Sequence, residues 1–311
     1  MWLDVTDLKE PLGGAIAIGN FDGVHLGHRA VVDHLRRCGL PSAVLVPDPH
    51  PLAVLGHPQP LLTDMLLRGR LLQAAGVRSL VRLPFDRATA DMDADAFVQG
   101  IILERLAPRH VVVGFNFTYG RGASGDVDRL QASLAEAGVP LDVVAPTLWD
   151  GEVVSSSRIR RRLAEGDLAT AHSLLGRPHL VRGVVRAGRG RGRTIGFPTA
   201  NVMTAPASAM PAEGVYAVRC LAGGAVLDGV ANLGPQPTFG AAESVLEVHL
   251  FDFQGDLYDQ EIEVAFAGLM RGQLRFDGPA ALARQIARDA AGAKEMLGVA
   301  TPGWDMLGWP G

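Results

Sequence analysis

The chain has 311 residues, a formal net charge of −4 and 48 % hydrophobic residues. Its length predicts two domains, and its acidic balance excludes a globally basic surface for nucleic acid. No apolar run approaches the ~18 residues needed to span a bilayer, and the charged start, MWLDVTDLKE, does not read as a signal peptide. The two cysteines lie far apart in the sequence, which is typical of a reducing cytosol. We therefore expect a cytoplasmic protein without nucleic-acid or membrane partners, and a homo-oligomer is compatible with this composition.

The stretch IAIGNFDGVHLGH, residues 16–28, joins a short apolar strand to a helix through a glycine turn. Residues 29–37 continue with helical spacing of apolar side chains, so His25 and His28 lie near a helix start. Glycines let a backbone approach a phosphate, and a helix N-terminus attracts anions. The spacing of the two histidines, with no third ligand close in the sequence, does not fit the usual helical zinc pair. A phosphate site is favoured, although glycine turns also follow strands in α/β proteins that bind nothing there.

Predicted strands and helices alternate through the rest of the first half. Three prolines in residues 47–51 predict an extended loop after the second strand. The alternation indicates a parallel sheet with helices on both faces, and in such sheets ligands bind at the carboxyl ends of the strands. The expected strands are 42–46, 79–83, 110–114 and 141–145, and the expected helices are 64–75, 93–106 and 130–137.

Two further loops follow predicted strands. Residues 114–126 combine three aromatic residues and four glycines with polar side chains, a mixture that suits a flat ring with polar recognition; a surface loop is the alternative. In residues 154–160, Ser155 or Ser156 is expected to cap a helix, and Arg158 brings positive charge towards a phosphate. An ordinary capped basic helix explains that second pattern about equally well.

Four motifs in order resemble the FMN adenylyltransferase module of prokaryotic bifunctional FAD synthetases: IGNFDGVHLGH, PDPHPLAVL, VVVGFNFTYGRGASGD and VSSSRIRRRLAEGDLATAHSLLGRP. The segments His25–His28 and Ser156–Arg158 resemble the HxGH and serine-arginine signatures of nucleotidylyltransferases. The resemblance implies a Rossmann-like domain in which FMN lies against Asn116, Phe117 and Asp126, with Asp126 also a metal candidate. The ATP-binding residues that it implies are Gly19, Asn20, Phe21, Asp22, Gly23, His25, His28, Ser156 and Arg158.

The chemistry of adenylyl transfer fits these residues. A phosphate oxygen of FMN attacks the α-phosphorus of ATP and pyrophosphate leaves, so the nucleophile is already anionic and no strong base is required. Catalysis then consists of positioning and charge stabilisation. His25 and His28 are expected at the α- and leaving phosphates, and Arg158 at the β- and γ-phosphates.

The hydrophobic pattern of the sequence changes near residues 175–178, where helical spacing ends at a Gly-Arg-Pro segment. Short β-rich segments with glycine turns follow, and one long helix comes near the end, which predicts a small antiparallel barrel with a terminal helix. We expect domains at 1–177 and 178–298 and a tail at 299–311. The predicted strands are 181–185, 214–220, 225–233, 245–251 and 261–266, and the helix is 279–297.

An arginine-glycine run, residues 186–193, leads into a turn that contains Pro198, Thr199 and Asn201. The run alone resembles an RNA-binding tract, but it is short and the chain is acidic. A hydroxyl on Thr199 and an amide oxygen on Asn201 are hard ligands that better suit Mg²⁺ and a polyphosphate.

Glu247 lies in an apolar strand, where alternation places it on one face with Val245 and His249. By pattern alone a surface carboxylate is favoured over a poised base. The motifs GRTIGFPTAN, GVYAV, GVANLGPQPTFG, LEVHLFDF and DLY, however, resemble the riboflavin kinase module. That resemblance implies that Glu247 is the base for the 5′-hydroxyl of riboflavin and that Arg271 lies near the flavin. The Mg-ATP residues that it implies are Gly196, Pro198, Thr199 and Asn201.

Together the two resemblances predict an enzyme that phosphorylates riboflavin to FMN and adenylylates FMN to FAD, using ATP with Mg²⁺. Two alternatives stay open. In the first, only one module is active and the other has lost its activity. In the second, the chain is a flavin- or nucleotide-binding regulator without turnover.

Overall fold

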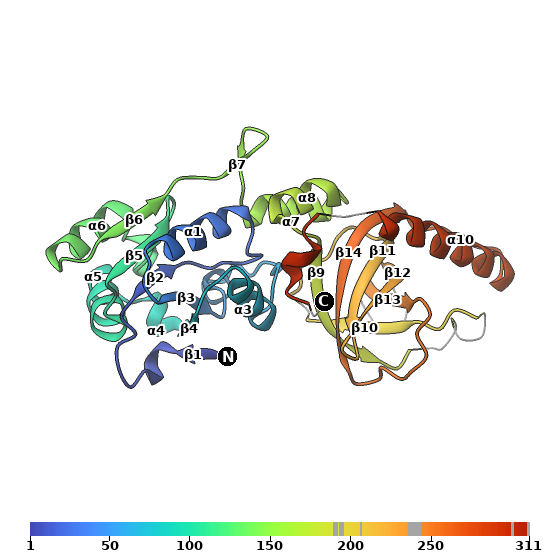
Figure 1. Cartoon of the computed structure of the whole chain (residues 1–311), viewed down its shortest axis with the longest axis horizontal. Coiled ribbons are helices and arrows are strands. Elements are labelled where there is room, and N and C mark those ends of the chain that lie inside the picture. The colour runs from blue at the N-terminus through green and yellow to red at the C-terminus, as the bar shows by residue number, and fades with distance from the viewer. Residues whose placement is uncertain (189–191, 193–195, 206, 236–243, 300–301, 310–311) are drawn as a thin grey trace. The chain divides into compact units, whose positions relative to one another are not determined.

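The computed structural model describes residues 1–188, 192, 196–205, 207–235, 244–299 and 302–309. The chain forms two compact units (Figure 1). The N-terminal unit comprises Met1–Pro60 and Met65–Ser155, and the C-terminal unit comprises Leu61–Asp64 and Ser156–Gly311. Residues 156–177 thus group with the second unit in space, and the sequence domain 1–177 stays a prediction.

The N-terminal unit is built on a six-stranded sheet of order β1-β4-β3-β2-β5-β6, in which every neighbouring pair is parallel. Its central strands are apolar runs; all four residues of β2 are buried, as expected for a strand covered on both faces. The chain order reverses between β2 and β5, so the loops after these two strands share the switch point where such sheets bind ligands. The strands are β1 Trp2–Asp4, β2 Ala15–Ile18, β3 Ser42–Asp48, β4 Ser79–Pro84, β5 His110–Gly114 and β6 Leu141–Val144.

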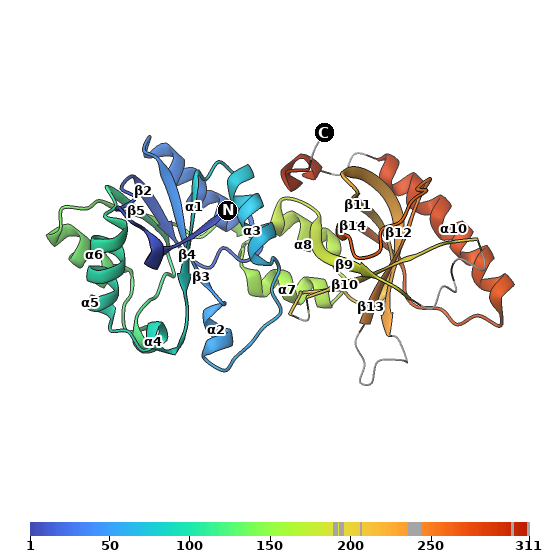
Figure 2. The same ribbon diagram turned by 90° about the horizontal axis from the view of Figure 1, so that it is seen from below.

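Helices pack on both faces of this sheet (Figures 1 and 2). Residues of η2 and α6 share a buried cluster with β2, β3 and β5, and α1 contacts β2, β5 and β6. The helices are η1 Val5–Asp7, α1 Leu26–Arg37, α2 Pro51–Val54, α3 Met65–Ala74, α4 Arg87–Ala90, α5 Ala94–Ala96, η2 Phe97–Leu106, η3 Arg121–Ala123 and α6 Val127–Glu136; a hairpin of β7 Leu148–Trp149 and β8 Glu152–Val153 follows.

Two details of the N-terminal unit differ from the sequence-based expectation. The stretch 47–51 is not wholly extended, because α2 begins at Pro51, a position where the missing N–H of proline costs no helical hydrogen bond. The helix expected over 93–106 is present, but from Phe97 onwards it has π-helical geometry, which is rare beyond a single turn.

The C-terminal unit contains a closed antiparallel barrel of order β10-β13-β12-β11-β14-β9, followed by a long helix. The barrel and terminal helix predicted from the sequence are confirmed. The strand β10 was not predicted, since residues 198–201 were interpreted as a turn. The elements are α7 Ser156–Ala164, α8 Leu168–Leu175, β9 His179–Arg186, β10 Ala200–Thr204, β11 Gly214–Ala222, β12 Ala225–Pro235, β13 Ser244–Leu250, β14 Glu261–Arg271, α10 Pro279–Gly298 and η4 Trp304–Leu307.

The C-terminal tail packs on this barrel. The Trp304 ring lies 4.7 Å from the guanidinium of Arg219, and Trp309 Nε1 donates a hydrogen bond of 2.5 Å to Glu263. Leu307, between them, is fully buried. The described residues of the expected 299–311 tail therefore include a segment that belongs to the C-terminal unit and covers part of the barrel.

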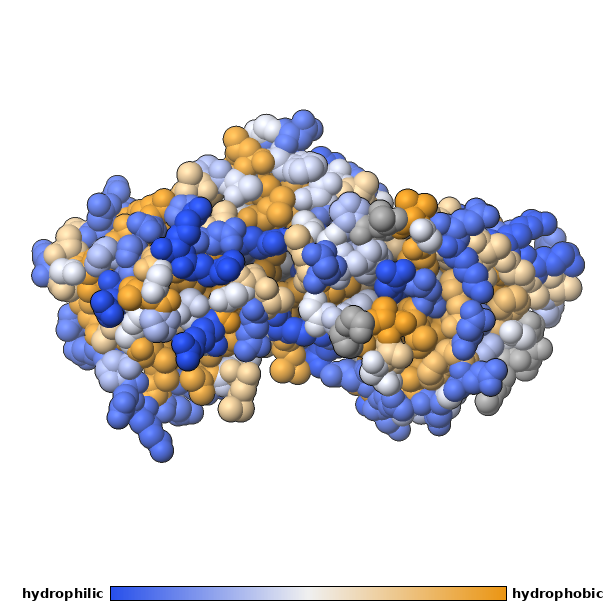
Figure 3. Space-filling model, in the orientation of Figure 1, coloured by the Kyte–Doolittle hydropathy of each residue, from blue (hydrophilic) through white to orange (hydrophobic). Residues whose placement is uncertain are grey.

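On the face drawn in Figure 3, hydrophilic and hydrophobic residues are interspersed. Within the described ranges, no helix combines the length and the apolar character needed to cross a membrane.

A histidine in α8 predicts a pH-dependent stability. Burial, with the nearby charge of Arg177, lowers the pKa of His172 from its ordinary value of 6.5 to about 4. The unfolded chain therefore binds more protons between these values, so folding stability is complete above pH 6.5 and falls as the pH drops towards 4, by about 3 kcal/mol. Calorimetric unfolding at pH 7.5 and 5 should show a smaller loss for His172→Gln, whereas His57→Gln, at an exposed site, should behave like wild type. Equal losses in all three proteins would contradict this assignment.

Candidate active sites

The histidine loop lies at the carboxyl end of β2, where α1 begins. His25 is the N-cap of α1, and its Nδ1 accepts a hydrogen bond of 3.3 Å from the backbone N–H of His28. Because Nδ1 accepts, a neutral His25 ring carries its proton on Nε2. The cap hydrogen bond thus selects the tautomer of a neutral His25 in which the N–H donor is Nε2.

The two imidazoles of the motif are stacked. The ring centroids of His25 and His28 lie 3.6 Å apart, with the ring planes inclined by 15°. Gly27 permits this packing, because a Cβ there would lie 3.2 Å from His25 Cε1. Burial, together with the charges of His25 and Arg68, holds the pKa of His28 well below its usual value. His28 is therefore neutral at pH 7, and it can act through hydrogen bonds rather than as a cation.

Close to the histidines lies a buried ion pair that was not predicted from the sequence. Arg68, on α3, contacts Asp22 at 3.3 Å (Nη2 to Oδ1) and donates a 3.0 Å hydrogen bond to the carbonyl of Asn20. The two charged side chains are 2 % and 1 % exposed. They hold a loop in which Phe21 and Val24 adopt left-handed backbone conformations, with φ of 49° and 43°, which are costly for such residues. An arginine inside the apolar run MLLRGRLLQA was the available signal, but its partner is 46 residues away.

We expect Arg68→Met to destabilise the N-terminal unit by about 3–5 kcal/mol, because it removes a buried cation that contacts the Asp22 carboxylate. Adding Asp22→Asn to this variant should recover part of the loss. Urea unfolding measures the effect, and Arg87→Met, which removes an exposed ion pair with Asp91, should cost less than about 0.5 kcal/mol. Similar losses for Arg68→Met and Arg87→Met would contradict a supporting role for the buried pair.

The loop after β5 lies at the same switch point. Asn116 is exposed and Phe117 is half-buried, stacking on Tyr119 with 5.6 Å between ring centroids. Asp126 caps α6, because its Oδ1 accepts a 2.9 Å hydrogen bond from the backbone N–H of Arg129. One of its oxygens is thus engaged by the helix. Its expected role at a metal, and those of Asn116 and Phe117 at FMN, stay predictions.

The serine-arginine turn lies in the C-terminal unit. Ser156 is the first residue of α7, and Arg158, two residues later, is 8 % exposed. The expected helix is therefore present, while a shared ATP site formed by Arg158 with the histidine loop stays a prediction.

In the barrel, register aligns the expected kinase residues. Asn201 on β10 is paired with Glu247 on β13, and Glu247 is in turn paired with Asn232 on β12. Paired residues of an antiparallel ladder share one face of the sheet. Leu246 and Val248 are buried on the other face, so the alternation predicted for this strand is confirmed.

The segment before β10 lies over the same face of β13. His249 Nδ1 donates a 2.8 Å hydrogen bond to the carbonyl of Pro198, and Phe197 meets the His249 ring edge-on at 5.4 Å. Thr199, next in the chain, is thereby held beside the Glu247 strand. Gly196 is described, but half of the arginine-glycine run 186–193 (residues 189–191 and 193), residues 194–195 and the end of the motif GVANLGPQPTFG (236–240) lie outside the described residues.

Arg271 is anchored by α10. Its guanidinium binds both oxygens of Asp289, with Nη2 to Oδ2 at 2.6 Å and Nε to Oδ1 at 3.1 Å. Two residues further on, Gln273 donates hydrogen bonds to Asn232 Oδ1 (3.0 Å) and to the carbonyl of Leu233 (2.7 Å). We call Asn201, Glu247 and Asn232, which are paired across β10, β13 and β12, the Glu247 row. The segment after β14 thus contacts this row through Gln273. Neither Asn232 nor Gln273 was among the site residues predicted from the sequence, and the role of Arg271 beside the flavin stays a prediction.

A doubly wound sheet with a His-x-Gly-His loop, joined to a barrel with a carboxylate opposite an asparagine, defines a two-module nucleotide-dependent transferase. The comparisons with known proteins agree. A family model for FAD synthetase matches residues 7–158 and one for riboflavin kinase matches residues 175–297. The chain belongs to the family of bifunctional riboflavin kinase/FMN adenylyltransferases.

Relatives in distant bacteria cover nearly the whole chain. The bifunctional riboflavin kinase/FMN adenylyltransferase of Escherichia coli (strain K12) is 38 % identical over 297 residues, which are 93 % of this chain and 95 % of that protein. The protein of the same name from Bacillus subtilis (strain 168) is 35 % identical over 292 residues, which are 90 % and 92 % of the two chains.

Among solved structures, one from Streptococcus pneumoniae superimposes with a TM-score of 0.83 at 28 % identity, covering 96 % of this chain and 99 % of that one. That structure is described as a macrolide-efflux protein. The likeness concerns the fold of the whole chain, both units included.

Proposed function

We propose that the barrel phosphorylates riboflavin to FMN through Glu247, and that the N-terminal unit adenylylates FMN to FAD through His25 and His28. The observation that carries the proposal is that one chain holds both the capped histidine pair and the paired Asn201–Glu247 row. Each set is positioned by helices or strands, which hold side chains in a catalytic geometry more precisely than loops do.

In the kinase step, Glu247 accepts the proton of the riboflavin 5′-hydroxyl as that oxygen attacks the γ-phosphorus of ATP, and ADP leaves. Thr199 and Asn201 offer a hydroxyl and an amide oxygen, a donor set that fits Mg²⁺ with substrate phosphates completing the shell. When bound, Mg²⁺ neutralises charge on the phosphate oxygens. Gly196 and Pro198 shape the segment that carries Thr199, and Gln273 steadies Asn232 beside the base.

In the adenylyl step, a phosphate oxygen of FMN attacks the α-phosphorus and the bond to pyrophosphate breaks. The Nε2–H of His25 donates to the α-phosphate, and neutral His28 hydrogen-bonds the leaving phosphates. Residues 19–23 bring backbone groups to the nucleotide, and Arg158, with Ser156, holds the terminal phosphates. Asn116 and Phe117 orient FMN, and Asp126 offers its second oxygen to a metal.

Both reactions consume ATP, and both cysteines are free thiols; we place the enzyme in the cytoplasm, with small-molecule substrates and no nucleic-acid or membrane partner.

Purified full-length protein with riboflavin and Mg-ATP tests the proposal, with flavins separated by chromatography. FMN should form first and FAD with pyrophosphate afterwards. Accumulation of FMN without FAD would remove the second activity, and the absence of any riboflavin-dependent ATP consumption would leave only a binding protein.

A further inference from the structure

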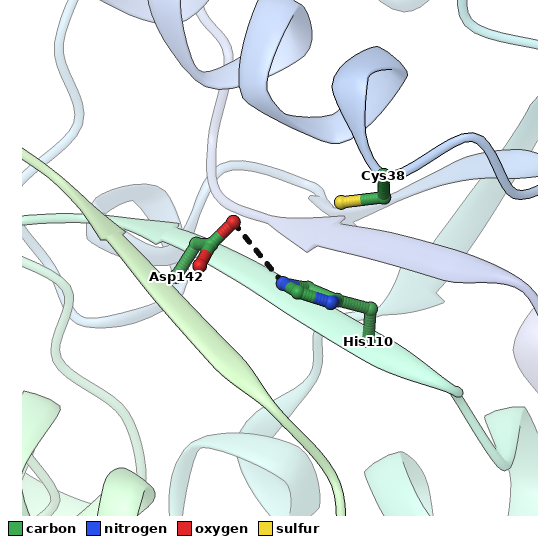
Figure 4. A group of neighbouring side chains, drawn as sticks. All are labelled: Cys38, His110 and Asp142. Atoms are coloured by element: carbon green, nitrogen blue, oxygen red, sulfur yellow. Dashed lines mark ion pairs between the residues drawn. The ribbon is translucent and has the colours of Figure 1, made fainter.

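Three side chains of different ligand chemistry meet in the N-terminal unit, at the amino edge of its sheet (Figure 4). Cys38 ends α1, His110 begins β5 and Asp142 lies in the neighbouring strand β6. Because the histidine loop and the loop after β5 leave the carboxyl edge, about 13 Å away along a five-residue strand, these side chains belong to neither reaction.

The cluster has the geometry of a nearly assembled metal site. One ligand atom from each residue, sulfur, nitrogen and oxygen, lies within 4.8 Å of the other two. His110 Nε2 and Asp142 Oδ2 are 3.1 Å apart, yet Nε2 is shielded from solvent and makes no hydrogen bond with the described residues. Cys38 Sγ makes a contact of 3.4 Å with the carbonyl of His34. A polar atom that is buried without a hydrogen bond, and that faces a carboxylate and a thiol, is a reason to look for an ion.

We propose that Cys38, His110 and Asp142 bind Zn²⁺. A thiolate, an imidazole nitrogen and a carboxylate are the ligands that zinc takes in proteins, and three protein ligands leave a fourth position for water. The side chains of His110 and Asp142 are 21 % and 46 % exposed, so the cluster lies near the surface of the unit although Nε2 itself is covered. Mg²⁺ and Ca²⁺, which require oxygen ligands, fit this set poorly.

Closing the site requires a small movement. At zinc–ligand distances of about 2.0–2.3 Å, tetrahedral ligand atoms lie roughly 3.5 Å apart, so the most distant pair must approach by about 1 Å. The His110–Asp142 pair, at 3.1 Å, is already slightly closer than this separation. The Cys38 thiol loses its proton as zinc binds. The ion then links the end of α1, whose other end is the histidine loop, to β5 and β6.

The test uses Co²⁺ added to the full-length protein after chelator treatment and dialysis. Cobalt bound to a thiolate gives a sulfur-to-metal charge-transfer band in the near ultraviolet, and the chain has only two cysteines. We expect the band to appear, to saturate at one cobalt per chain and to vanish when Zn²⁺ is added. Cys38→Ala should abolish it, whereas Cys220→Ala, in the barrel, should keep it.

The other two ligands are tested by affinity. His110→Gln and Asp142→Asn should each weaken cobalt binding by at least the roughly 10–100-fold that even an outer-shell partner is worth, while Glu136→Gln, at an exposed position of α6, should not. Circular dichroism of the metal-free variants establishes that each is folded. No band, a band that survives Cys38→Ala, or unchanged affinity in both ligand variants would overturn the proposal.

Discussion

Replacing Glu247 by glutamine is expected to lower riboflavin phosphorylation by about 10²–10⁴-fold, the range that a general base contributes. Glutamine keeps the size of the side chain and its place opposite Asn201 and Asn232, but it cannot accept the proton of the 5′-hydroxyl. Adenylylation of supplied FMN should continue at the wild-type rate, because Glu247 lies in the barrel. The measurement is kcat for each half-reaction, with riboflavin and ATP or with FMN and ATP.

A matched change on the neighbouring strand serves as the control. Asp228→Asn also converts a carboxylate to an amide on the barrel, but Asp228 pairs with Arg219 and lies outside the Glu247 row. Its kinase rate should stay within a few-fold of wild type. If Glu247→Gln phosphorylates riboflavin at a rate near that of Asp228→Asn, Glu247 is not the base and its place in the row is structural.

The elements that sequence pattern predicted are those with a strong period. The apolar runs of β2, β3 and β5 and the helices between them indicated a parallel sheet, and the alternation around Glu247 placed that side chain on one face of β13. The strand β10 was missed because Phe197-Pro198-Thr199 has turn chemistry, and the strand begins only at Ala200. A local sequence pattern reflects only the conformational preferences of its residues. The strand β10 forms because the barrel supplies β9 and β13 as pairing partners, and these lie elsewhere in the sequence.

Site residues likewise fall into two groups: those marked by a local motif and those whose partners are distant in the sequence. His25 and His28 could be selected because their spacing is local and the helix start is visible in the sequence. Arg68 could not, because its role depends on Asp22, to which folding alone brings it close. Asn232 and Gln273 are likewise joined across 41 residues. Motifs thus identify the residues that we propose to meet substrate, whereas the residues that hold them in place are found only from register and packing.

For the second activity, His28→Ala is expected to lower FAD formation from supplied FMN by about 10²-fold or more, the usual scale for losing a contact to charge that develops in the transition state. Phosphorylation of riboflavin should be unaffected. Because burial and neighbouring positive charge hold the pKa of His28 well below 6.5, its contribution should stay constant between pH 6.5 and 8, whereas a cationic histidine would lose its effect over that range.

Three variants separate this role from a structural one. His28→Asn retains an N–H donor and should keep more activity than His28→Ala, although the ring that stacks on His25 at 3.6 Å is lost in both. His57→Ala, at an exposed position of the same unit, should match wild type. FAD formation is measured by chromatography, and folding by circular dichroism. Parallel loss of both activities in folded His28→Ala would mean that the two sites are coupled, and equal activity of His28→Ala and His57→Ala would remove His28 from the reaction.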